Sequence, residues 1–423
     1  MASVVFYFQV HQPYRLRRYS VFDSDPFYFD AEKNAQLCRK VADKCYRPAT
    51  TLLLDLIKRH EGRFKVSFSL TGTVLEQFAE YTPDVLDLFK QLAETGCCEF
   101  IAETYYHSLS FLYSREEFTT QVNMHTRKIQ ELFGQTPTVF RNTELIYNND
   151  LAHYVSTMPA EGDPDGKPRF LGAICEGTDW HLGYRSPNFL YRPPHTGMTA
   201  SGKPFAMMLK NYRLSDDIAF RFSNRAWSEY PLPAERFAEW VNNINGNGYV
   251  CNLFMDYETF GEHQWAETGI FKFLDALPGK VFDAAPGQNE FLTPAEALKK
   301  YDTVGSYDVP HMISWADTER DLSAWLGNAM QSNALNEVFR LERLVKQRLS
   351  QAQHGGDEHT IRQATSLVED WRRLTTSDHF YYMSTKYWAD GDVHKYFSPY
   401  ESPYDAYINY MNVLDNLRSR ATN

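Results

Sequence analysis

The sequence lacks the short motifs of several large enzyme classes. It contains no G-x-S-x-G element of a serine hydrolase, no phosphate-binding P-loop and no glycine-rich dinucleotide fingerprint. It also has no run of about 18 apolar residues, so we expect no membrane-spanning helix and no membrane partner. These absences disfavour nucleophilic serine chemistry, phosphate-dependent activity and a membrane protein.

Cysteine is scarce, and its spacing fits neither a zinc site nor a disulfide framework. Of the six cysteines, Cys97 and Cys98 are adjacent, which is a poor geometry for a disulfide. The amino terminus has no basic segment, no long apolar stretch and no small-residue cleavage site. We therefore expect buried free thiols, no secretory signal and a cytoplasmic location.

Basic residues are outnumbered by acidic ones, 43 against 54, which gives a formal charge of −11. An acidic surface repels phosphate backbones, so a nucleic-acid partner is disfavoured. Aromatic residues, in contrast, make up 15% of the chain, and 27 Tyr and 8 Trp are among them. Because these two side chains combine an apolar ring with a polar group, their abundance favours a wet binding cleft. Most of the Phe side chains are expected in the core.

Apolar, β-rich runs alternate with helical patterns from residue 1 to about residue 260. This alternation predicts βαβ units and a parallel sheet that is buried on both faces. Seven such runs favour a barrel-like sheet that is incomplete. The predicted strands are Ser3–Val10, Phe64–Leu70, Cys97–Ala102, Val139–Glu144, Phe170–Cys175, Phe205–Lys210 and Tyr249–Tyr257.

The later part of the chain has a helical pattern, as in Leu322, Trp325, Leu326 and Ala329. The predicted fold class is therefore α/β, an incomplete (β/α)7 barrel followed by a C-terminal α-helical bundle. We expect a barrel domain over 1–310 and the bundle over 311–423. The irregular segment around 149–211 is rich in Gly, Pro and aromatics, which predicts a long loop insertion that forms a lid or part of a cleft.

Polar side chains follow several of the predicted strands directly, where α/β sheets carry their sites. His11 follows the first strand, and His107 follows the third in a loop with two tyrosines. Glu144 ends the fourth strand, and an unpaired buried carboxylate there would be strongly unfavourable. Glu144 is therefore either functional or paired with Arg141 in a structural ion pair. The loop around His107 either lines a cleft or is an ordinary aromatic loop.

The last predicted strand runs into three carboxylates and a histidine, from Asp256 to His263. Asp256 and Glu258 point to the same side if the strand persists, because side chains alternate along a strand. Two like charges at this spacing raise at least one pKa, which is the usual way to obtain a general acid at neutral pH. Further along, Trp315 could stack on a sugar ring, and Asp317 or Thr318 is predicted to cap the following helix.

Two carboxylates on separate strand ends, together with aromatic, His and Asn groups, fit glycosidic-bond cleavage. The same segments resemble those of glycoside hydrolase family 57, specifically its α-amylase-type members. The second region departs from commoner forms at Ala102-Glu103-Thr104, which leaves acceptor-side specificity open. Five segments resemble the five family regions in order: His11-Gln12-Pro13, Gly96–Ser108, Asn142-Thr143-Glu144, Asp256–Gly261 and Ser314–Asp317. A further segment, Leu214–Arg221, resembles the α-amylase branch.

The resemblance implies a retaining enzyme on α-1,4-glucans such as maltooligosaccharides, with the bundle contributing to the active-site cleft. Glu144 would be the nucleophile and Asp256 the acid/base, with no cofactor and no metal. The expected substrate-binding residues are His11, His107, Asp217, Glu258, His263 and Trp315. Three alternatives stay open: a 4-α-glucanotransferase with the same residues, a metal-dependent sugar hydrolase or deacetylase that uses His11 and His107, and a non-catalytic glucan-binding protein.

Overall fold

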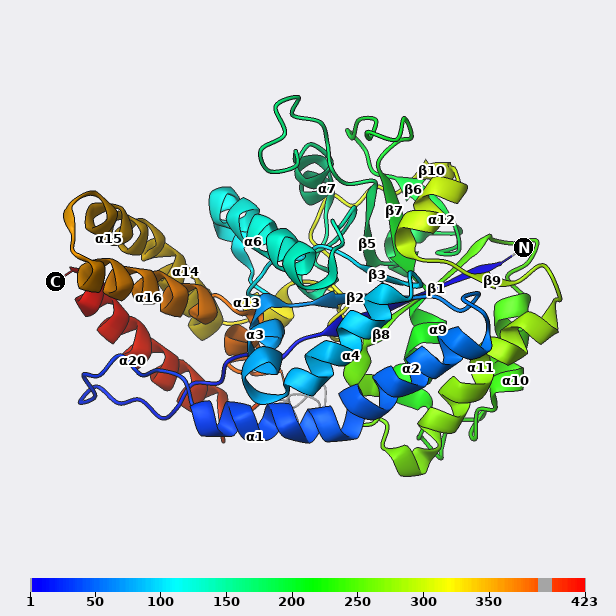
Figure 1. The fold of residues 1–423 in the computed structure, drawn as a ribbon, viewed down its shortest axis with the longest axis horizontal. Coiled ribbons are helices and arrows are strands. Elements are labelled where there is room, and N and C mark those ends of the chain that lie inside the picture. Colours follow the sequence, from blue (N-terminus) through cyan, green and yellow to red (C-terminus); the bar gives the residue numbers. More distant parts are fainter. Residues whose placement is uncertain (1, 387–397, 423) are drawn as a thin grey trace.

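The computed structural model describes residues 2–386 and 398–422. Strands form the middle of the molecule and helices surround them (Figure 1). The helices of the C-terminal part lie together at the end of the molecule opposite the N-terminus (Figure 1). The predicted α/β class is thus confirmed. Among the described residues, no helix is both long enough and apolar enough to cross a membrane.

The strands form two sheets that are mostly parallel. The first has the order β3-β2-β1-β8, with β9 also pairing with β1, and the second has the order β10-β6-β7-β5-β4. A parallel bridge between Ala102 and Phe140 joins the β3 side of one sheet to β4 of the other. The bounds of these strands are β1 Ser3–Val10, β2 Val66–Leu70, β3 Cys98–Phe100, β4 Val139–Arg141, β5 Gly172–Glu176, β6 Leu190–Arg192, β7 Ala206–Lys210, β8 Val250–Asp256, β9 Glu290–Phe291 and β10 Thr303–Ser306.

All seven predicted strands are present, as β1 to β5, β7 and β8, with ends that differ from the prediction by up to three residues. Three short strands were not predicted: β6, β9 and β10. Of these, β6 is antiparallel to β7, and β9 has only two residues. Such short edge segments carry too few residues to show an alternating pattern.

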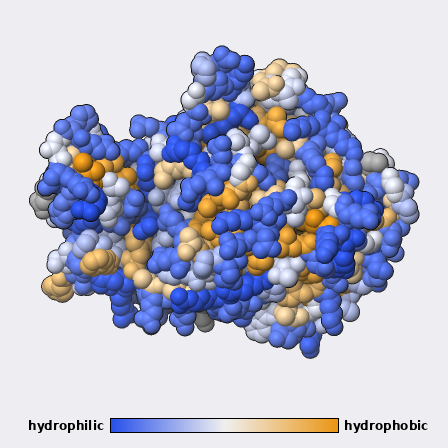
Figure 2. Space-filling model, viewed as in Figure 1, coloured by the Kyte–Doolittle hydropathy of each residue, from blue (hydrophilic) through white to orange (hydrophobic). Residues whose placement is uncertain are grey.

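Helices cover the strands on the outside. Those up to residue 300 are α1 Ala31–Val41, η1 Ala42–Tyr46, α2 Arg47–Arg59, α3 Gly72–Tyr81, α4 Pro83–Glu94, α5 Ser110–Tyr113, α6 Arg115–Phe133, η2 Thr143–Leu145, α7 Asn149–Ser156, α8 Asp179–Leu182, α9 Tyr212–Asp216, η3 Asp217–Arg221, α10 Ala234–Asn242, η4 Tyr257–Thr259, η5 Ala266–Thr268, α11 Ile270–Ala284 and α12 Pro294–Lys300. Hydrophilic side chains cover most of the face in Figure 2, and apolar ones gather between helices near its middle.

Helix α6 shows how local sequence sets these elements. The Ser114 side chain accepts a hydrogen bond from the Glu117 backbone N–H at 3.1 Å, which caps the first turn. Phe118, Val122 and Ile129 recur on one face and are buried. Gly134 ends the helix with a φ of 68°, a left-handed conformation that glycine adopts without strain. Local sequence thus sets the start, the buried face and the end of this helix.

The core continues from one sheet to the other. Phe6 and Phe8 of β1 point outward and pack against the helices. Val5 and Tyr7 alternate with them and pack inward against residues of the second sheet, including Ile174 and Met208. The two sheets therefore enclose a shared interior, and the carboxyl ends of their parallel strands meet at one end of it.

The later helices have a core of their own. They are α13 Ser323–Leu326, α14 Ala329–Arg340, α15 Glu342–Gly355, α16 Glu358–Leu374, α17 Ser377–Tyr381 and α20 Pro403–Thr422. Leu16, Tyr19 and Tyr28 pack into the same core, so the segment after β1 joins this helical part. The helix that follows Trp315 begins only at Ser323, so the prediction that Asp317 or Thr318 caps it was wrong.

Two further predictions meet the structure here. The segment around 149–211, predicted as a loop insertion, contains regular elements: α7, α8 and the strands β5, β6 and β7. Of these, β5 and β7 correspond to predicted strands, whereas strong Gly and Pro signals in the connecting turns obscured α7, α8 and β6. The six cysteines are all free and buried, as predicted.

Candidate active site

The carboxyl ends of the parallel strands bring four predicted residues to one end of the shared interior. His11 follows β1, His107 lies in the loop after β3, Glu144 follows β4, and Asp256 ends β8. Contacts and charge interactions link all four, as described below. The position is the one expected for the functional site of a parallel α/β fold.

Glu144 lies on the short turn η2 in a left-handed backbone conformation, with a φ of 57°. Non-glycine residues rarely adopt this conformation, and such strain clusters at functional sites. Its carboxylate is held on both oxygens. Oε1 lies 3.0 Å from Nε2 of His107, and Oε2 accepts a hydrogen bond of 2.7 Å from the indole N–H of Trp315. Ser377 also donates to Oε1, at 3.4 Å.

These donors set the charge of Glu144. Burial alone would raise its pKa, but the hydrogen bond and positive charge of His107, followed by the charge of Arg141, hold the pKa below its usual value. The carboxylate is therefore ionised at neutral pH, as a nucleophile must be.

His107 stands between two carboxylates. Its Nε2 contacts Glu144, and its Nδ1 lies 3.2 Å from Oε2 of the fully buried Glu103. Burial lowers the pKa of His107, but hydrogen bonds to Glu103 and Glu144 outweigh it and raise the pKa to about 9. Arg141, which the sequence suggested as a partner of Glu144, instead forms its ion pair with Glu103, at 3.5 Å.

Asp256 has the opposite environment. Burial, and then the negative charge of Glu144, raise its pKa to about 6. Arg141, Lys210 and His107 act against this rise. None of the described side chains donates a hydrogen bond to its carboxylate. A carboxyl group with this pKa can give and take a proton near neutral pH, which suits a general acid and base.

Glu258 lies two residues beyond Asp256 and is buried. Burial and the charge of Asp256 raise its pKa to about 8, so it is protonated at neutral pH. The Tyr46 hydroxyl donates a hydrogen bond to its carboxyl group. The charge of Asp256 thus raises the pKa of Glu258, so the predicted rise in at least one of the two pKa values is present. Nearby, Gly261 lies so close to η1 that a Cβ there would be 1.9 Å from the Lys44 carbonyl oxygen.

His11 connects this group to the helical part of the chain. Its Nε2 lies 3.0 Å from Oδ2 of Asp378 on α17, and its Nδ1 lies 2.9 Å from the Thr71 hydroxyl. Its ring stacks on that of His107 with centroids 4.1 Å apart. Sequence reasoning missed Ser377 and Asp378, because no local pattern marks a contact across more than 230 residues.

Trp315 reaches Glu144 because residue 313 pairs with Tyr147 in a short antiparallel bridge. Its ring also faces two cations: Arg141 Cζ lies 5.3 Å and Lys210 Nζ 5.4 Å from the ring centroid. Trp315 is thus a hydrogen-bond donor to Glu144 as well as an aromatic surface. Its predicted role as a sugar platform stays a prediction.

Two further predicted binding residues are Asp217 and His263. Asp217 begins η3 after β7 and forms an ion pair of 2.6 Å with Arg221. His263 follows η4, where its backbone N–H donates to the Glu258 carbonyl oxygen at 2.9 Å. Burial lowers the pKa of His263 to about 4, so its ring is neutral. Neither position tests the predicted contact with substrate.

A metal ion could in principle bridge three of these side chains. His11, His107 and Asp378 each bring one nitrogen or oxygen atom within 4.8 Å of the others. However, both nitrogens of His107 and both nitrogens of His11 are at hydrogen-bond distance from protein oxygens. We therefore interpret this group as a hydrogen-bond network.

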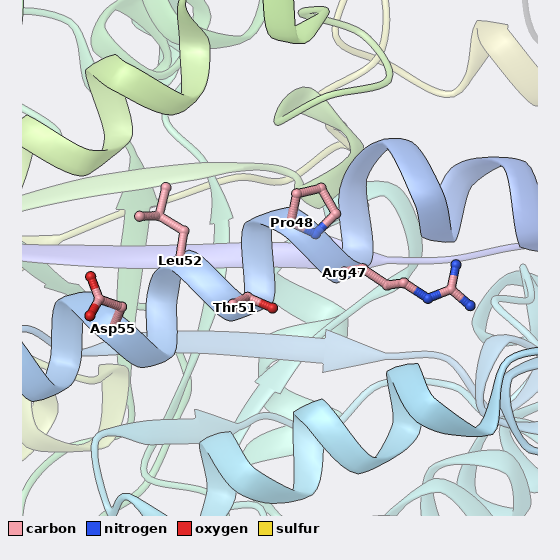
Figure 3. Close-up of a pocket in the computed structure, with 5 residues that line it drawn as sticks. All are labelled: Arg47, Pro48, Thr51, Leu52 and Asp55. Carbon is pink, nitrogen blue, oxygen red and sulfur yellow. The ribbon is translucent and has the colours of Figure 1, made fainter.

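A hollow on the outer surface of α2 is separate from this site. Figure 3 shows that all of its lining residues come from that one helix: Arg47, Pro48, Thr51, Leu52 and Asp55. Arg47 forms ion pairs with Asp43 and Asp84. None of the predicted site residues lines this hollow, and its charged groups have ordinary surface partners.

The family model of glycosyl hydrolase family 57 matches residues 5–310. A protein of Methanocaldococcus jannaschii named "Putative alpha-amylase" is 41% identical over 97% of this chain and 83% of its own length.

Solved structures show the same fold at low identity. The family 57 branching enzyme of Pyrococcus horikoshii is 16% identical with a TM-score of 0.65, over 100% of this chain and 94% of that chain. The 4-alpha-glucanotransferase of Thermococcus litoralis is 17% identical with a TM-score of 0.58, over 90% of this chain. The present chain spans only 56% of that transferase.

Proposed function

The chain belongs to glycosyl hydrolase family 57, and we propose that it is a retaining, α-amylase-type enzyme that cleaves α-1,4-glucans. The M. jannaschii relative, by its name, supports the amylase activity. Maltooligosaccharides, glycogen and starch are the proposed substrates. No cofactor is part of the proposal.

In the proposed mechanism, Glu144 attacks the anomeric carbon while Asp256 protonates the glycosidic oxygen. The bond between the anomeric carbon and the glycosidic oxygen breaks, and a covalent glycosyl ester forms on Glu144. Asp256, now ionised, takes a proton from a water molecule, whose oxygen attacks the anomeric carbon and releases Glu144. Two displacements leave the anomeric configuration unchanged.

The observation that carries this proposal is that the surroundings shift the pKa values of the two carboxyl groups in opposite directions. His107 and Trp315 donate hydrogen bonds that favour ionised Glu144. Asp256, in contrast, has a pKa of about 6 because of its burial and the charge of Glu144. Formation of the glycosyl ester removes that negative charge, so the pKa of Asp256 falls as it changes from acid to base.

The other predicted residues take supporting roles in the proposal. We assign substrate binding to His11, His107, Asp217, Glu258, His263 and Trp315. For Trp315, we add the role of holding Glu144. We also propose that residues 1–310 are one incomplete (β/α)7 barrel and that 311–423 form a helical domain. The contacts of Ser377 with Glu144 and of Asp378 with His11 support a contribution of this domain to the cleft.

The test is incubation with pure maltooligosaccharides, with products separated by chromatography and their anomers followed by NMR. We expect shorter oligomers that appear first as α-anomers. Products longer than the substrate would show that glucan, and not water, accepts the glycosyl group, which is the activity of a 4-α-glucanotransferase. The Glu144→Gln variant should be inactive, while Glu131→Gln on the exposed side of α6 serves as the matched control.

A further inference from the structure

We propose that Glu103 is a positioning residue for the nucleophile: it keeps His107 doubly protonated, so that His107 holds and charge-stabilises Glu144. The inference rests on the proposed function of Glu144. Glu103 lies where the sequence departs from commoner forms of the family region, and the proposed mechanism gives it no role of its own.

The contacts of Glu103 leave it no access to solvent and join it to the site. Its carboxylate is fully buried, with Oε2 facing Nδ1 of His107 at 3.2 Å and Nη1 of Arg141 at 3.5 Å. Its other oxygen accepts a hydrogen bond of 3.2 Å from the Gln9 side chain. Thr104 fixes the loop between Glu103 and His107, because its hydroxyl contacts that of Thr143 at 2.9 Å.

The hydrogen positions on His107 follow from its two neighbours. An ionised carboxylate can only accept hydrogen bonds, and His107 has one on each ring nitrogen. Both nitrogens must therefore carry a proton, which makes the ring an imidazolium. The hydrogen bond from His107, followed by the charge of Arg141, holds the pKa of Glu103 at about 2 despite its burial, so this acceptor stays ionised.

The charges around His107 come from several elements. Glu144 on η2, Asp256 at the end of β8 and Asp378 on α17 favour its positive charge. Arg141 of β4 opposes it, with Nη1 3.4 Å from Nδ1. His11 stacks on the ring, and burial together with the charge of His107 lowers the pKa of His11, so only one of the two rings is charged. Glu103 is the anion that lies between the two cations His107 and Arg141.

Removal of this anion should change the charge of His107 without removing its contact with Glu144. In Glu103→Gln, Arg141 can donate to a deprotonated Nδ1, while Nε2 keeps its proton and still donates to Glu144. The nucleophile then has a neutral partner in place of a cation. Its pKa rises, it becomes a poorer leaving group in the second displacement, and Asp256 loses a nearby positive charge as well.

The experiment measures kcat and KM on maltooligosaccharides against pH for the wild type, Glu103→Gln and Glu103→Asp. For Glu103→Gln we expect kcat to fall about 10- to 100-fold with little change in KM, and both limbs of the pH profile to move to higher pH. Glu103→Asp, which keeps the charge, should recover part of the rate. Glu99→Gln is the matched control, because this β3 side chain accepts a hydrogen bond from the backbone N–H of Ala295, in the first turn of α12, instead of contacting the site.

A lower kcat with an unshifted pH profile would contradict the proposal and leave only a structural role for Glu103. Histidine-selective ¹⁵N NMR of the wild type gives a second test that needs no variant at Glu103. The His107 signal, assigned from its loss in His107→Gln, should show two protonated nitrogens at pH 7, and a neutral ring would overturn the proposal. If Glu144→Gln is as active as the wild type, the proposed function fails; if it is inactive while the Glu103 tests fail, only this inference does.

Discussion

The ends of β4 and β8 each present a carboxyl group to the same space, in opposite surroundings. At the β4 end, Glu144 accepts hydrogen bonds on both oxygens from His107 and Trp315. At the β8 end, Asp256 has a second carboxyl group, Glu258, as its close neighbour. The first environment stabilises a negative charge and the second disfavours one. Residue type alone therefore does not decide which group is ionised.

The glutamates next to the two reacting carboxyl groups, Glu103 and Glu258, also differ in charge. Behind Glu144 lies the ionised Glu103, which is balanced by Arg141 and His107. Behind Asp256 lies Glu258, whose neighbour is the uncharged Tyr46 hydroxyl and whose pKa is about 8. The nucleophile Glu144, which must be ionised, thus has an ionised glutamate, Glu103, behind it. The proposed acid Asp256, which must carry a proton, has a protonated glutamate, Glu258, beside it. Four measurements test whether the two ends of the site differ in this way.

The largest effect is expected when either reacting carboxyl group is removed. Glu144→Ala and Asp256→Ala should each lower glucan cleavage roughly 10³-fold or more. With α-maltosyl fluoride and azide, both should regain activity, because fluoride needs no proton to leave. In Glu144→Ala the C–F bond breaks as azide bonds to the anomeric carbon, whereas in Asp256→Ala it breaks as Glu144 forms the glycosyl ester, and azide then displaces Glu144. Azide takes the place of Glu144 in the first variant and of water in the second. NMR should therefore show β-maltosyl azide from Glu144→Ala and α-maltosyl azide from Asp256→Ala, and the same anomer from both would contradict the assignment.

A smaller loss is expected when Glu144 loses one donor. Trp315→Phe keeps an aromatic ring but removes the indole N–H, so kcat should fall about 10- to 100-fold. The pKa of Glu144 should rise, which moves the acid limb of the pH profile to higher pH. Trp180→Phe, on an exposed ring, is the control. A higher KM with unchanged kcat in Trp315→Phe would mean that the ring binds sugar and does not hold the nucleophile.

The sequence predicts one part of this comparison well. Continuous apolar runs mark the seven main strands, and the polar residues that follow them place His11, His107, Glu144 and Asp256 at one end of the sheet. The proximity of Asp256 and Glu258 also follows from the sequence, because the two are only two residues apart. These features depend on local pattern and on the rule that parallel strands align their ends.

The rest depends on which distant partner each charge finds. Arg141 is adjacent to the Glu144 turn, yet it pairs with Glu103 because both side chains are fully buried in the same interior. Ser377 and Asp378 reach the site only because α17 packs against the loop after β3, where the Ser377 N–H donates to the His107 carbonyl oxygen. Tertiary packing selects these pairs, and no spacing in the sequence records them.

A third prediction compares the same substitution, Glu to Gln, at Glu258 and at Glu103. Glu258 is protonated near neutral pH, and glutamine resembles a protonated carboxyl group in shape and charge. Glu258→Gln should therefore change kcat by less than about 3-fold at pH 6, although Glu103→Gln lowers it strongly. Steady-state kinetics at pH 6 on both variants tests the difference. An equal, large loss in Glu258→Gln would show that Glu258 works as an anion and that the two ends of the site are not opposites.

The smallest effect concerns stability. The pKa of Glu258 is about 8 in the folded chain and near 4.5 when unfolded, so between these values the folded state binds more protons and loses stability as pH rises. Glu258→Gln removes this loss, so its unfolding free energy relative to that of the wild type should rise by about 1–3 kcal/mol from pH 5.5 to pH 8, and its melting temperature should rise relative to that of the wild type as well.

The stability that Glu103 contributes depends on pH in the opposite direction, because the pKa of Glu103 is about 2 in the folded chain. Its contribution to stability is complete above the unfolded pKa and is lost only as pH falls toward 2. Ionised Glu103 therefore contributes equally at pH 5.5 and pH 8, but His107 does not. The pKa of His107 is about 9 when folded and near 6.5 when unfolded, so the stability that its charge adds is complete at pH 5.5 and partly lost at pH 8. Because Glu103→Gln removes the anion that keeps His107 charged, the deficit of this variant should be larger at pH 5.5 than at pH 8. Melting curves of the two variants at these two pH values separate a buried glutamate that is kept neutral from one that is kept charged. A deficit in Glu103→Gln that is as large at pH 8 as at pH 5.5 would mean that Glu103 does not hold the charge of His107, and the positioning role proposed for Glu103 would then be wrong.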